Sequence, residues 1–389
     1  MKYFKVLILV NDLSSFVSNR LPIAEKLISK QFKVYIAYGE LGGADLKKLK
    51  DKGLKTFHVQ MRRGGVNILE DIKSFYFIWK LIRNLCPDIL HLVTIKPYLY
   101  GGVISRILNV PCVVSAVAGL GSVFIQQNLK SKFLRILLYP LYIFAFGHPN
   151  QYIILQNKDD KKFLLKWGVI KPNKICLIPG SGVKLENFVK LTEYKTLPRV
   201  CFVGRLIKEK GIYDFISAAK LLKKRDIKAK FLVAGNKDLK NPSGLNNENL
   251  KKIKTEGFVK LLGYQKNIPI LYSKSHIICL PSYREGMPKA LIDAAAASRA
   301  IVTTNVPGCR QSIIPNVSGL LVPIKSPRKL ADAIQWLIEN PVKRINMGKN
   351  GRKLAKKKFE INKIVKLHLD IYLKLLKKKF SLKKYNILM

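Results

Sequence analysis

The stretch RVCFVGRLIKEKGIYDFISAAKLL, residues 199–222, has the pattern of a β-strand that ends in a glycine turn and leads into a helix. Similar short runs of β-branched and apolar residues alternate with longer amphipathic stretches along the chain. Strand runs that are apolar on both faces and separated by helices indicate a parallel sheet covered on both sides. The sequence therefore predicts an α/β fold.

This alternation occurs twice. Strands are predicted first at 5–10, 32–38, 55–61, 89–94, 112–117, 151–156 and 174–179, and then at 199–204, 228–235, 259–264, 276–282, 300–306 and 319–323. We predict a doubly wound, Rossmann-like domain over 1–183, a linker over 184–198, a second such domain over 199–358, and a basic C-terminal helix over 359–389 that returns toward the first domain. Ligands of such sheets bind beyond the carboxyl ends of the strands, so we expect the two domains to face a cleft.

The chain has 71 basic and 24 acidic residues, a formal net charge of +47. Both halves are basic, and such a field attracts nucleic acid, anionic lipid surfaces or phosphorylated small molecules. A lysine-rich compositional bias would also produce this charge. We find no helix-turn-helix or zinc-knuckle signature, so we do not expect nucleic acid as a partner.

The six cysteines form no C-x-x-C pair, and most fall within apolar strand-like runs. This pattern is typical of reduced, buried thiols in a cytoplasmic protein and gives no metal site. The first residues are interpreted as a buried strand and not as a signal peptide. The longest apolar run, 133–147, is shorter than the ~20 residues that span a bilayer, so no transmembrane helix is predicted.

The second-half stretch PSYREGMPKALID, residues 281–293, places two carboxylates around a strand-to-helix turn. Pro288 suits a first helical position, and the N–H groups there can bind a phosphate. Gly286 lets a ligand approach the backbone. Glu285 can then accept hydrogen bonds from sugar hydroxyls, and Asp293, about two turns along the helix, is expected to reach the same ligand. The alternative is an ordinary turn with two solvated acids.

A diphosphate site is indicated by the turn at 204–211. Gly204 ends the strand, Arg205 follows it, and Lys210 precedes the next helix. A guanidinium fork and an ammonium point charge near a helix start are what a diphosphate requires.

These motifs, with TTNVPGCRQSI (303–313) and SGLLVP (318–323), resemble glycosyltransferase family 4, whose members are retaining enzymes of the GT-B fold. The resemblance implies that Glu285 contacts the transferred sugar and that Asp293 holds the nucleotide ribose. It also implies that Arg205 and Lys210, beside Gly204, stabilise the departing diphosphate. Backbone groups of Gly286, Met287 and Pro288 would bind sugar and phosphate. Neither a metal nor another cofactor is implied, because cations and a helix N-terminus neutralise the leaving group.

Three further stretches, 91–102, 116–125 and 234–243, are similar to enzymes that build bacterial surface polysaccharides on an undecaprenyl-diphosphate carrier. The nearest group adds N-acetylgalactosamine to lipid-linked diacetylbacillosamine. Departures from the family pattern are Asp293 in place of a second glutamate, and Asn19 and Ala118 where relatives have histidines. A degenerate, weakened copy of such an enzyme is therefore one alternative.

For the acceptor side we assign Arg20, Lys96 and Gly119, which follow predicted first-domain strands. Exposed basic residues without such a role are the alternative, and His91 is interpreted as a core histidine. The basic, apolar segments 128–147 and 363–384 are candidates for contact with an anionic membrane surface, although the first also fits a core helix.

Together these features predict a cytoplasmic enzyme, peripheral on the inner face of the cytoplasmic membrane. It would transfer a sugar from a UDP-sugar to an undecaprenyl-diphosphate-linked saccharide in capsule, O-antigen or glycan biosynthesis. A UDP-N-acetylglucosamine 2-epimerase of the same fold is one alternative, and a basic nucleic-acid- or membrane-binding protein without catalysis is another.

Overall fold

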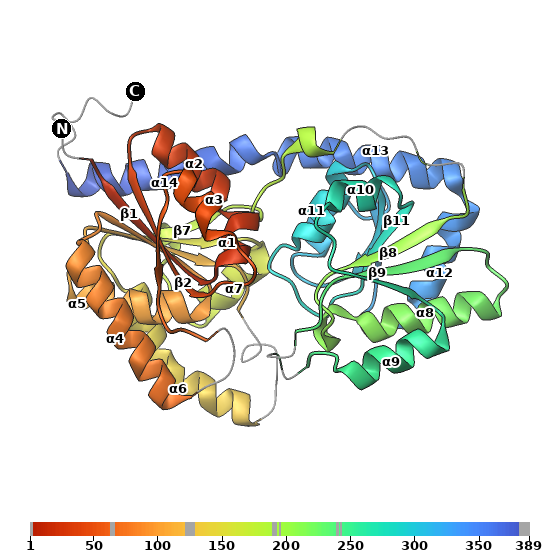
Figure 1. Ribbon diagram of the computed structural model, residues 1–389, viewed down its shortest axis with the longest axis horizontal. Helices are drawn as coiled ribbons and strands as arrows, with labels where there is room; N and C mark the ends of the chain where they lie inside the picture. The colour runs from red at the N-terminus through yellow and green to blue at the C-terminus, as the bar shows by residue number, and fades with distance from the viewer. Residues whose placement is uncertain are drawn as a thin grey trace. The chain divides into compact units, whose positions relative to one another are not determined.

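The computed structural model describes residues 3–62, 67–120, 129–188, 193, 196–238, 241 and 243–380 (Figure 1). The chain forms two compact units. Unit 1 contains Met1–Ser181 and Asn362–Met389, and unit 2 contains Gly182–Ile361. The C-terminal segment is therefore part of the same unit as the N-terminal half.

Unit 1 is built on a parallel sheet of seven strands in the order β3-β2-β1-β4-β5-β6-β7. The strands are β1 Lys5–Asp12, β2 Lys33–Glu40, β3 Lys55–His58, β4 Ile89–Val93, β5 Cys112–Val117, β6 Gln151–Leu155 and β7 Ile175–Leu177. Each lies at a predicted position, and the α/β fold class is confirmed. The order reverses direction between β1 and β4, as in a doubly wound sheet.

Helices cover both faces of this sheet. They are α1 Leu13–Asn19, α2 Leu21–Ser29, α3 Leu46–Asp51, α4 Ile68–Leu85, α5 Gly102–Ile107, α6 Leu129–Phe146, α7 Lys158–Lys166 and α14 Ile361–Lys379, with a π-helical turn, η1 Pro97–Gly101, and a 3-10 turn, η3 Pro172–Lys174. Helices α4, α5 and α6 lie on one side and α14 on the other (Figure 1). Leu7, Leu9 and Leu92 of the sheet pack with Ile78 of α4 and Tyr142 of α6.

Unit 2 contains a parallel sheet of six strands in the order β10-β9-β8-β11-β12-β13. The strands are β8 Arg199–Val203, β9 Lys230–Ala234, β10 Lys260–Gly263, β11 Ile277–Leu280, β12 Ala300–Thr304 and β13 Gly319–Val322. The helices are α8 Ile212–Lys224, α9 Asn247–Glu256, α10 Ile268–Ser273, α11 Lys289–Ala296, α12 Pro327–Glu339 and α13 Pro341–Lys358, with short 3-10 turns η4 Leu185–Asn187, η5 Lys208–Lys210 and η6 Arg310–Ser312. All six predicted strands are confirmed.

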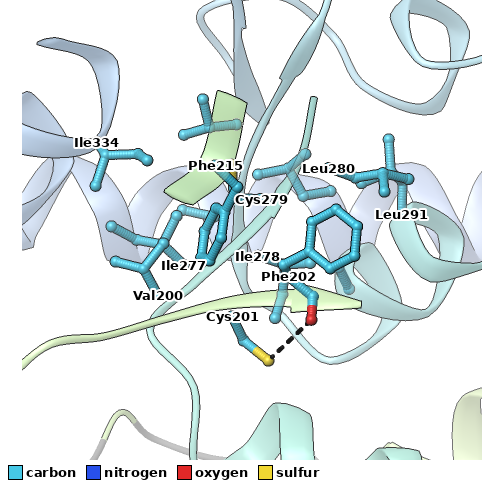
Figure 2. Packing of buried hydrophobic residues seen from close by; sticks show 14 of the residues in the cluster. Val200, Cys201, Phe202, Phe215, Ile277, Ile278, Cys279, Leu280, Leu291 and Ile334 are labelled. Carbon is cyan, nitrogen blue, oxygen red and sulfur yellow. Dashed lines mark hydrogen bonds between the residues drawn. The ribbon is translucent and has the colours of Figure 1, made fainter. Parts of the chain in front are cut away.

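The core of unit 2 lies between its sheet and the surrounding helices (Figure 2). Phe202 and Ile278 of the two central strands are fully buried with Phe215 of α8, Leu291 of α11 and Ile334 of α12. The strands β8 and β11 are thereby fixed as the centre of the sheet, and the turns that follow them are held close together.

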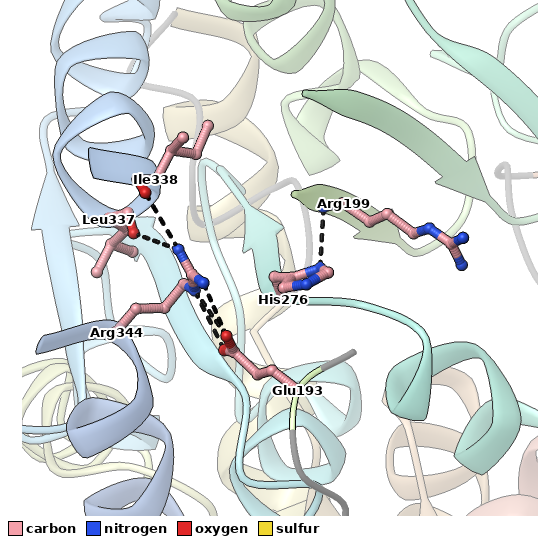
Figure 3. A network of polar contacts seen from close by, with 6 residues as sticks. All are labelled: Glu193, Arg199, His276, Leu337, Ile338 and Arg344. Carbon is pink, nitrogen blue, oxygen red and sulfur yellow. Dashed lines mark hydrogen bonds and ion pairs between the residues drawn. The ribbon is translucent and has the colours of Figure 1, made fainter. Parts of the chain in front are cut away.

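The segment that we predicted as a linker packs on unit 2 where the structure describes it. The carbonyl of Phe188 accepts from Nη1 of Arg352 in α13 at 2.5 Å. The carboxylate of Glu193 accepts from Nε and Nη2 of Arg344, at 3.1 and 2.7 Å (Figure 3). Arg344 also donates to the carbonyl of Leu337 at 2.8 Å, so this one side chain fixes both the segment and the end of α12.

All six cysteines are free thiols, and four of them are buried. Cys86, which follows α4, is exposed, and Cys176 is partly buried. In the described part of the chain, no helix has the length and apolar character that crossing a membrane requires.

Candidate active site

The turns after β8 and β11 lie side by side at the carboxyl edge of the unit 2 sheet, because these strands are parallel neighbours. The N–H of Tyr283, in the second turn, donates to the carbonyl of Glu209, in the first, at 2.8 Å. Gly211 fits tightly between them: its φ is +72°, and a Cβ there would lie 2.0 Å from the carbonyl oxygen of Pro281. This glycine is required both for its conformation and for the close approach of the turns.

The two turns bring Lys210 and Glu285 together as an ion pair. The hydroxyl of Ser282 donates to the same carboxylate at 2.7 Å. The lysine side chain is 18% exposed and that of the glutamate 11%. Two residues that were predicted separately from the sequence thus form one partly enclosed ion pair, in which the carboxylate orients the ammonium group.

Arg205 also has a carboxylate partner. Its Nη1 lies 2.6 Å from Oδ2 of Asp238, which follows the neighbouring strand β9. Asp238 was not among the predicted site residues, although it lies in the stretch 234–243 and follows a strand that is adjacent to β8 in the sheet. The nearby Gly235 packs on Gly204, because a Cβ on Gly235 would lie 1.8 Å from the Gly204 carbonyl oxygen.

The helix after Glu285 begins one residue later than predicted. Pro288 is its N-cap, with ψ at 118°, and α11 starts at Lys289. The carbonyl of Pro288 accepts from the N–H groups of Leu291 and Ile292 at 3.1 and 3.3 Å. The placement of Pro288 at the first helical position is therefore wrong, because its extended ψ leaves only the carbonyl within the helical bonding pattern.

Asp293 lies about one turn into α11 and not about two as expected, since the helix begins at Lys289. Its side chain is buried, and Oδ1 is 2.7 Å from Nζ of Lys289. Burial raises the pKa of Asp293, while the ammonium of Lys289 acts in the opposite direction. The alternative of two solvated acids is wrong, because both Glu285 and Asp293 are enclosed and paired.

The loop after β12 supports the Glu285 turn from the other side. Gly308 has a φ of +77°, and a Cβ there would lie 2.6 Å from the carbonyl oxygen of Glu285 and 2.4 Å from that of Gly286. The hydroxyl of Thr304 donates to the carbonyl of Ser282. The sequence of this loop resembles the family pattern but does not by itself predict this supporting role.

Below the turn, Met287 is nearly buried, with its Sδ 3.2 Å from the hydroxyl of Ser312. Together, the segments that follow β8, β9, β11 and β12 form one edge of the unit 2 sheet. This edge carries two cations, Arg205 and Lys210, each paired with a carboxylate. Within the described ranges, no group of three or more His, Cys, Asp or Glu residues is arranged to hold a metal ion.

In unit 1, Arg20 is buried and is the N-cap residue of α2, so the alternative of an exposed basic residue is wrong for it. Burial lowers the pKa of its guanidinium to about 10, against the opposing effect of Tyr372. His91 is fully buried, as predicted for a core histidine, and its Nδ1 is hydrogen-bonded to the Tyr372 hydroxyl of α14. Its ring stacks on His368 with centroids 5.9 Å apart.

Lys96 is not an exposed cation either. Its Nζ lies 2.6 Å from Oδ1 of Asp71 in α4, and both side chains are less than one-fifth exposed. Gly119 follows β5 with a φ of +150°. Residues 121–125 of the quoted stretch 116–125 lie outside the described residues, as do 381–384 of the basic segment 363–384.

Comparison with known proteins matches both units to glycosyltransferases. The family model described as glycosyl transferase 4-like matches residues 5–157, and the model described as glycosyl transferases group 1 matches 183–354. In fold, the chain is similar to HepE of Anabaena, crystallised with UDP and glucose, with a TM-score of 0.77 and 16% identity over 96% of this chain and 100% of the other.

Two curated relatives align along almost their whole length. One is the N,N'-diacetylbacillosaminyl-diphospho-undecaprenol alpha-1,3-N-acetylgalactosaminyltransferase of Campylobacter jejuni, 29% identical over 92% of this chain and 95% of the relative. The other is the UDP-Gal:alpha-D-GlcNAc-diphosphoundecaprenol alpha-1,3-galactosyltransferase of Escherichia coli, 27% identical over 90% of this chain and 91% of the relative. The chain therefore belongs to the GT-B glycosyltransferases, with a glycosyl transferase 4-like first half and a group 1 second half.

Proposed function

We propose that this enzyme is a retaining glycosyltransferase that moves an N-acetylhexosamine or hexose from a UDP-sugar to an undecaprenyl-diphosphate-linked saccharide. The observation that carries the proposal is the pairing of Lys210 with Glu285, beside Arg205 with Asp238, at one edge of the group 1 half. It is supported by relatives of similar length that are named as transferases acting on diphospho-undecaprenol saccharides.

In this proposal the donor diphosphate lies against Arg205 and Lys210. Negative charge develops on that diphosphate as the bond to the sugar breaks, and cations already fixed in place stabilise it without reorganising. Glu285 and Asp238 hold the two cations in position before the donor binds. The backbone N–H groups around Gly286, Met287 and the start of α11 add further positive potential. Neither a metal nor another cofactor is part of this proposal.

The sugar and ribose contacts follow from the same turn. Glu285 uses the lone pairs that Lys210 and Ser282 leave free to accept from hydroxyls of the transferred sugar. Asp293, held by Lys289, accepts from the ribose. Each carboxylate keeps a protein cation while it binds, so neither is left as an isolated buried charge.

The chemistry that we propose is a front-face displacement. The bond between the anomeric carbon and the diphosphate oxygen breaks, and a bond from that carbon to the acceptor oxygen forms on the same face. The acceptor hydroxyl gives its proton to the departing diphosphate oxygen, so no protein base is required and the anomeric configuration is kept.

For the acceptor we propose contributions from Arg20, Lys96 and Gly119 of the first half. The buried guanidinium of Arg20 has a positive charge with an Nε that lacks a hydrogen-bond partner among the described residues. A lipid-linked acceptor resides in a bilayer, so we place the enzyme in the cytoplasm, peripheral on the inner face of the cytoplasmic membrane.

The test is nucleotide release from a panel of UDP- and GDP-sugars, each with and without a bacterial undecaprenyl-diphosphate-saccharide extract. We expect release from one UDP-sugar only when the extract is present, and its loss in Glu285→Ala. Glu256→Ala, at an exposed acid at the end of α9, is the matched control and should behave as wild type. Acceptor-independent conversion of UDP-N-acetylglucosamine, with no transfer, would overturn the proposal in favour of a 2-epimerase.

A further inference from the structure

Helices α4 and α6 cover the same face of the unit 1 sheet (Figure 1). Both are anchored on η1, the π-helical turn at Pro97–Gly101. The ring of Phe75 in α4 lies 6.3 Å from that of Tyr100, and the ring of Tyr142 in α6 lies 6.0 Å from that of Tyr98. The inward sides of the two helices therefore pack on the core of the unit, and their outward sides belong to one face of it.

The outward side of α4 is apolar. Ile68, Leu69, Ile72 and Tyr76 are spaced along one side of the helix and are between 59 and 73% exposed. The buried residues Ser74, Ile78 and Ile82 occupy the opposite side. An ordinary helix of a water-soluble surface would carry polar residues on its outward side.

Helix α6 repeats the pattern. Leu129, Phe133, Ile136 and Leu137 lie on one side and are between 63 and 82% exposed. Scattered apolar residues are normal on a protein surface, but two helices of one face that both present large apolar side chains indicate an interaction surface.

The charges around these stripes are positive. Lys73, Lys80 and Arg83 of α4 are exposed. The two acids of this helix are already paired, Glu70 with Arg62 at 3.0 Å and Asp71 with Lys96 at 2.6 Å. The sequence of α6 contains basic residues and no acidic residue. Lys73, Lys80 and Arg83 have no ion-pair partner among the described residues, and apolar side chains with such cations at their margin are what an anionic bilayer surface binds.

A second copy of the chain fits this surface less well. In a symmetric dimer the same patch meets itself, so the exposed lysines and arginine of α4 would face their own copies and not acidic partners. The charge pattern therefore favours lipid over self-association.

We propose that the outward sides of α4 and α6 form a membrane-docking surface that inserts its apolar side chains among the acyl chains of an anionic bilayer, with the lysines and arginine at the headgroups. This proposal rests on the proposed function in one respect: membrane docking would bring the enzyme to a lipid-linked acceptor.

The experiment is vesicle flotation of the full chain with phosphatidylglycerol–phosphatidylethanolamine vesicles, and with phosphatidylcholine vesicles as the neutral comparison. We expect Ile72→Glu and Phe133→Glu each to lower the partition coefficient at least ~10-fold, because each replaces an apolar side chain that the bilayer would cover with a charge. Val342→Glu places the same charge at an apolar residue of α13 in unit 2 that is 69% exposed, and should bind as wild type. Both target residues are exposed in water, so we expect all variants to keep the wild-type melting temperature.

The results separate docking from catalysis, because flotation needs no turnover. Lost flotation with unchanged transfer to a water-soluble, short-chain diphosphate-saccharide supports the docking surface. Normal flotation of both α4 and α6 variants overturns it, as does equal binding of wild type to neutral vesicles. If sedimentation without lipid shows a dimer that the Ile72→Glu or Phe133→Glu variant disrupts, and flotation is unchanged, the membrane proposal is overturned in favour of a second copy of the chain. Docking with no transfer to any acceptor leaves the surface standing and defeats the proposed function.

Discussion

The Lys210–Glu285 pair makes a prediction that separates stability from catalysis. Lys210→Met removes the ammonium but keeps most of the side-chain volume, and leaves a carboxylate that is 11% exposed with Ser282 at 2.7 Å. Breaking a fully buried ion pair costs about 3–5 kcal/mol because one charge stays behind. With 18 and 11% exposure and the serine still in place, we expect a loss of about 2 kcal/mol in the free energy of unfolding of unit 2.

The double variant Lys210→Met/Glu285→Gln removes both charges. It should be at least about 1 kcal/mol more stable than Lys210→Met alone, since no uncompensated charge remains. Urea unfolding followed by fluorescence and circular dichroism measures these differences. Lys208→Met, at an exposed lysine two residues earlier, is the control and should change stability by less than about 0.5 kcal/mol.

Transfer activity should be lost in both the single and the double variant, because each lacks the cation proposed for the diphosphate. A double variant no more stable than Lys210→Met would refute the view that the two charges compensate each other. A Lys210→Met enzyme with wild-type turnover would refute the role of Lys210 at the leaving group.

Three further predictions concern the supports of this site. Burial raises the pKa of Asp293 in the folded state above 3.8, the unfolded value, so the stabilising effect of its protonated form is present at low pH and is lost as the pH rises above 3.8. From pH 3.8 upward, wild type should therefore lose unfolding free energy relative to Asp293→Asn. Urea titrations at several pH values measure this difference. Gly308→Ala should abolish UDP binding in calorimetry, because its Cβ would displace the Glu285 turn, whereas Gly263→Ala, with φ +66° and no neighbour within 4 Å, should cost only about 1 kcal/mol of strain and keep UDP binding. Arg344→Ala should lower the unfolding free energy of unit 2 by about 3 kcal/mol, because the carboxylate of Glu193, only 11% exposed, is left without its partner. A loss below about 1 kcal/mol would contradict this.

Sequence patterns were sufficient for the sheets because the signal is local. A strand such as Cys112–Val117 is buried on both faces, so its apolar run identifies it without reference to any distant residue. The start of α11 was misplaced by one residue because a proline at the N-cap and one at the first helical position look identical in sequence; only the ψ of 118° at Pro288 distinguishes them.

The partners of the predicted site residues were beyond such reasoning. Lys210 and Glu285 are 75 residues apart, and Arg205 and Asp238 are 33 apart. Each pair forms because parallel strands that are neighbours in the sheet end at the same edge. Sequence analysis identified the turns as ligand sites, but it did not show which acid holds which cation. That assignment depends on the strand order.

The apolar segment around α6 shows why composition alone could not decide between a core helix and a membrane-contacting helix. A helix that is apolar on every side fits a protein core and a lipid surface equally well, since both environments exclude water. The segment allowed both interpretations. The structure confirms the core interpretation for part of the helix, and contact of the rest with a membrane stays a prediction. Tyr142 and Phe146 are buried in the unit 1 core, while Phe133 and Ile136 face outward. Such a helix is costly to leave in water, so we infer an apolar partner for its outward side. The exposed cations of α4 have no acidic partner among the described residues, and they favour lipid as that partner.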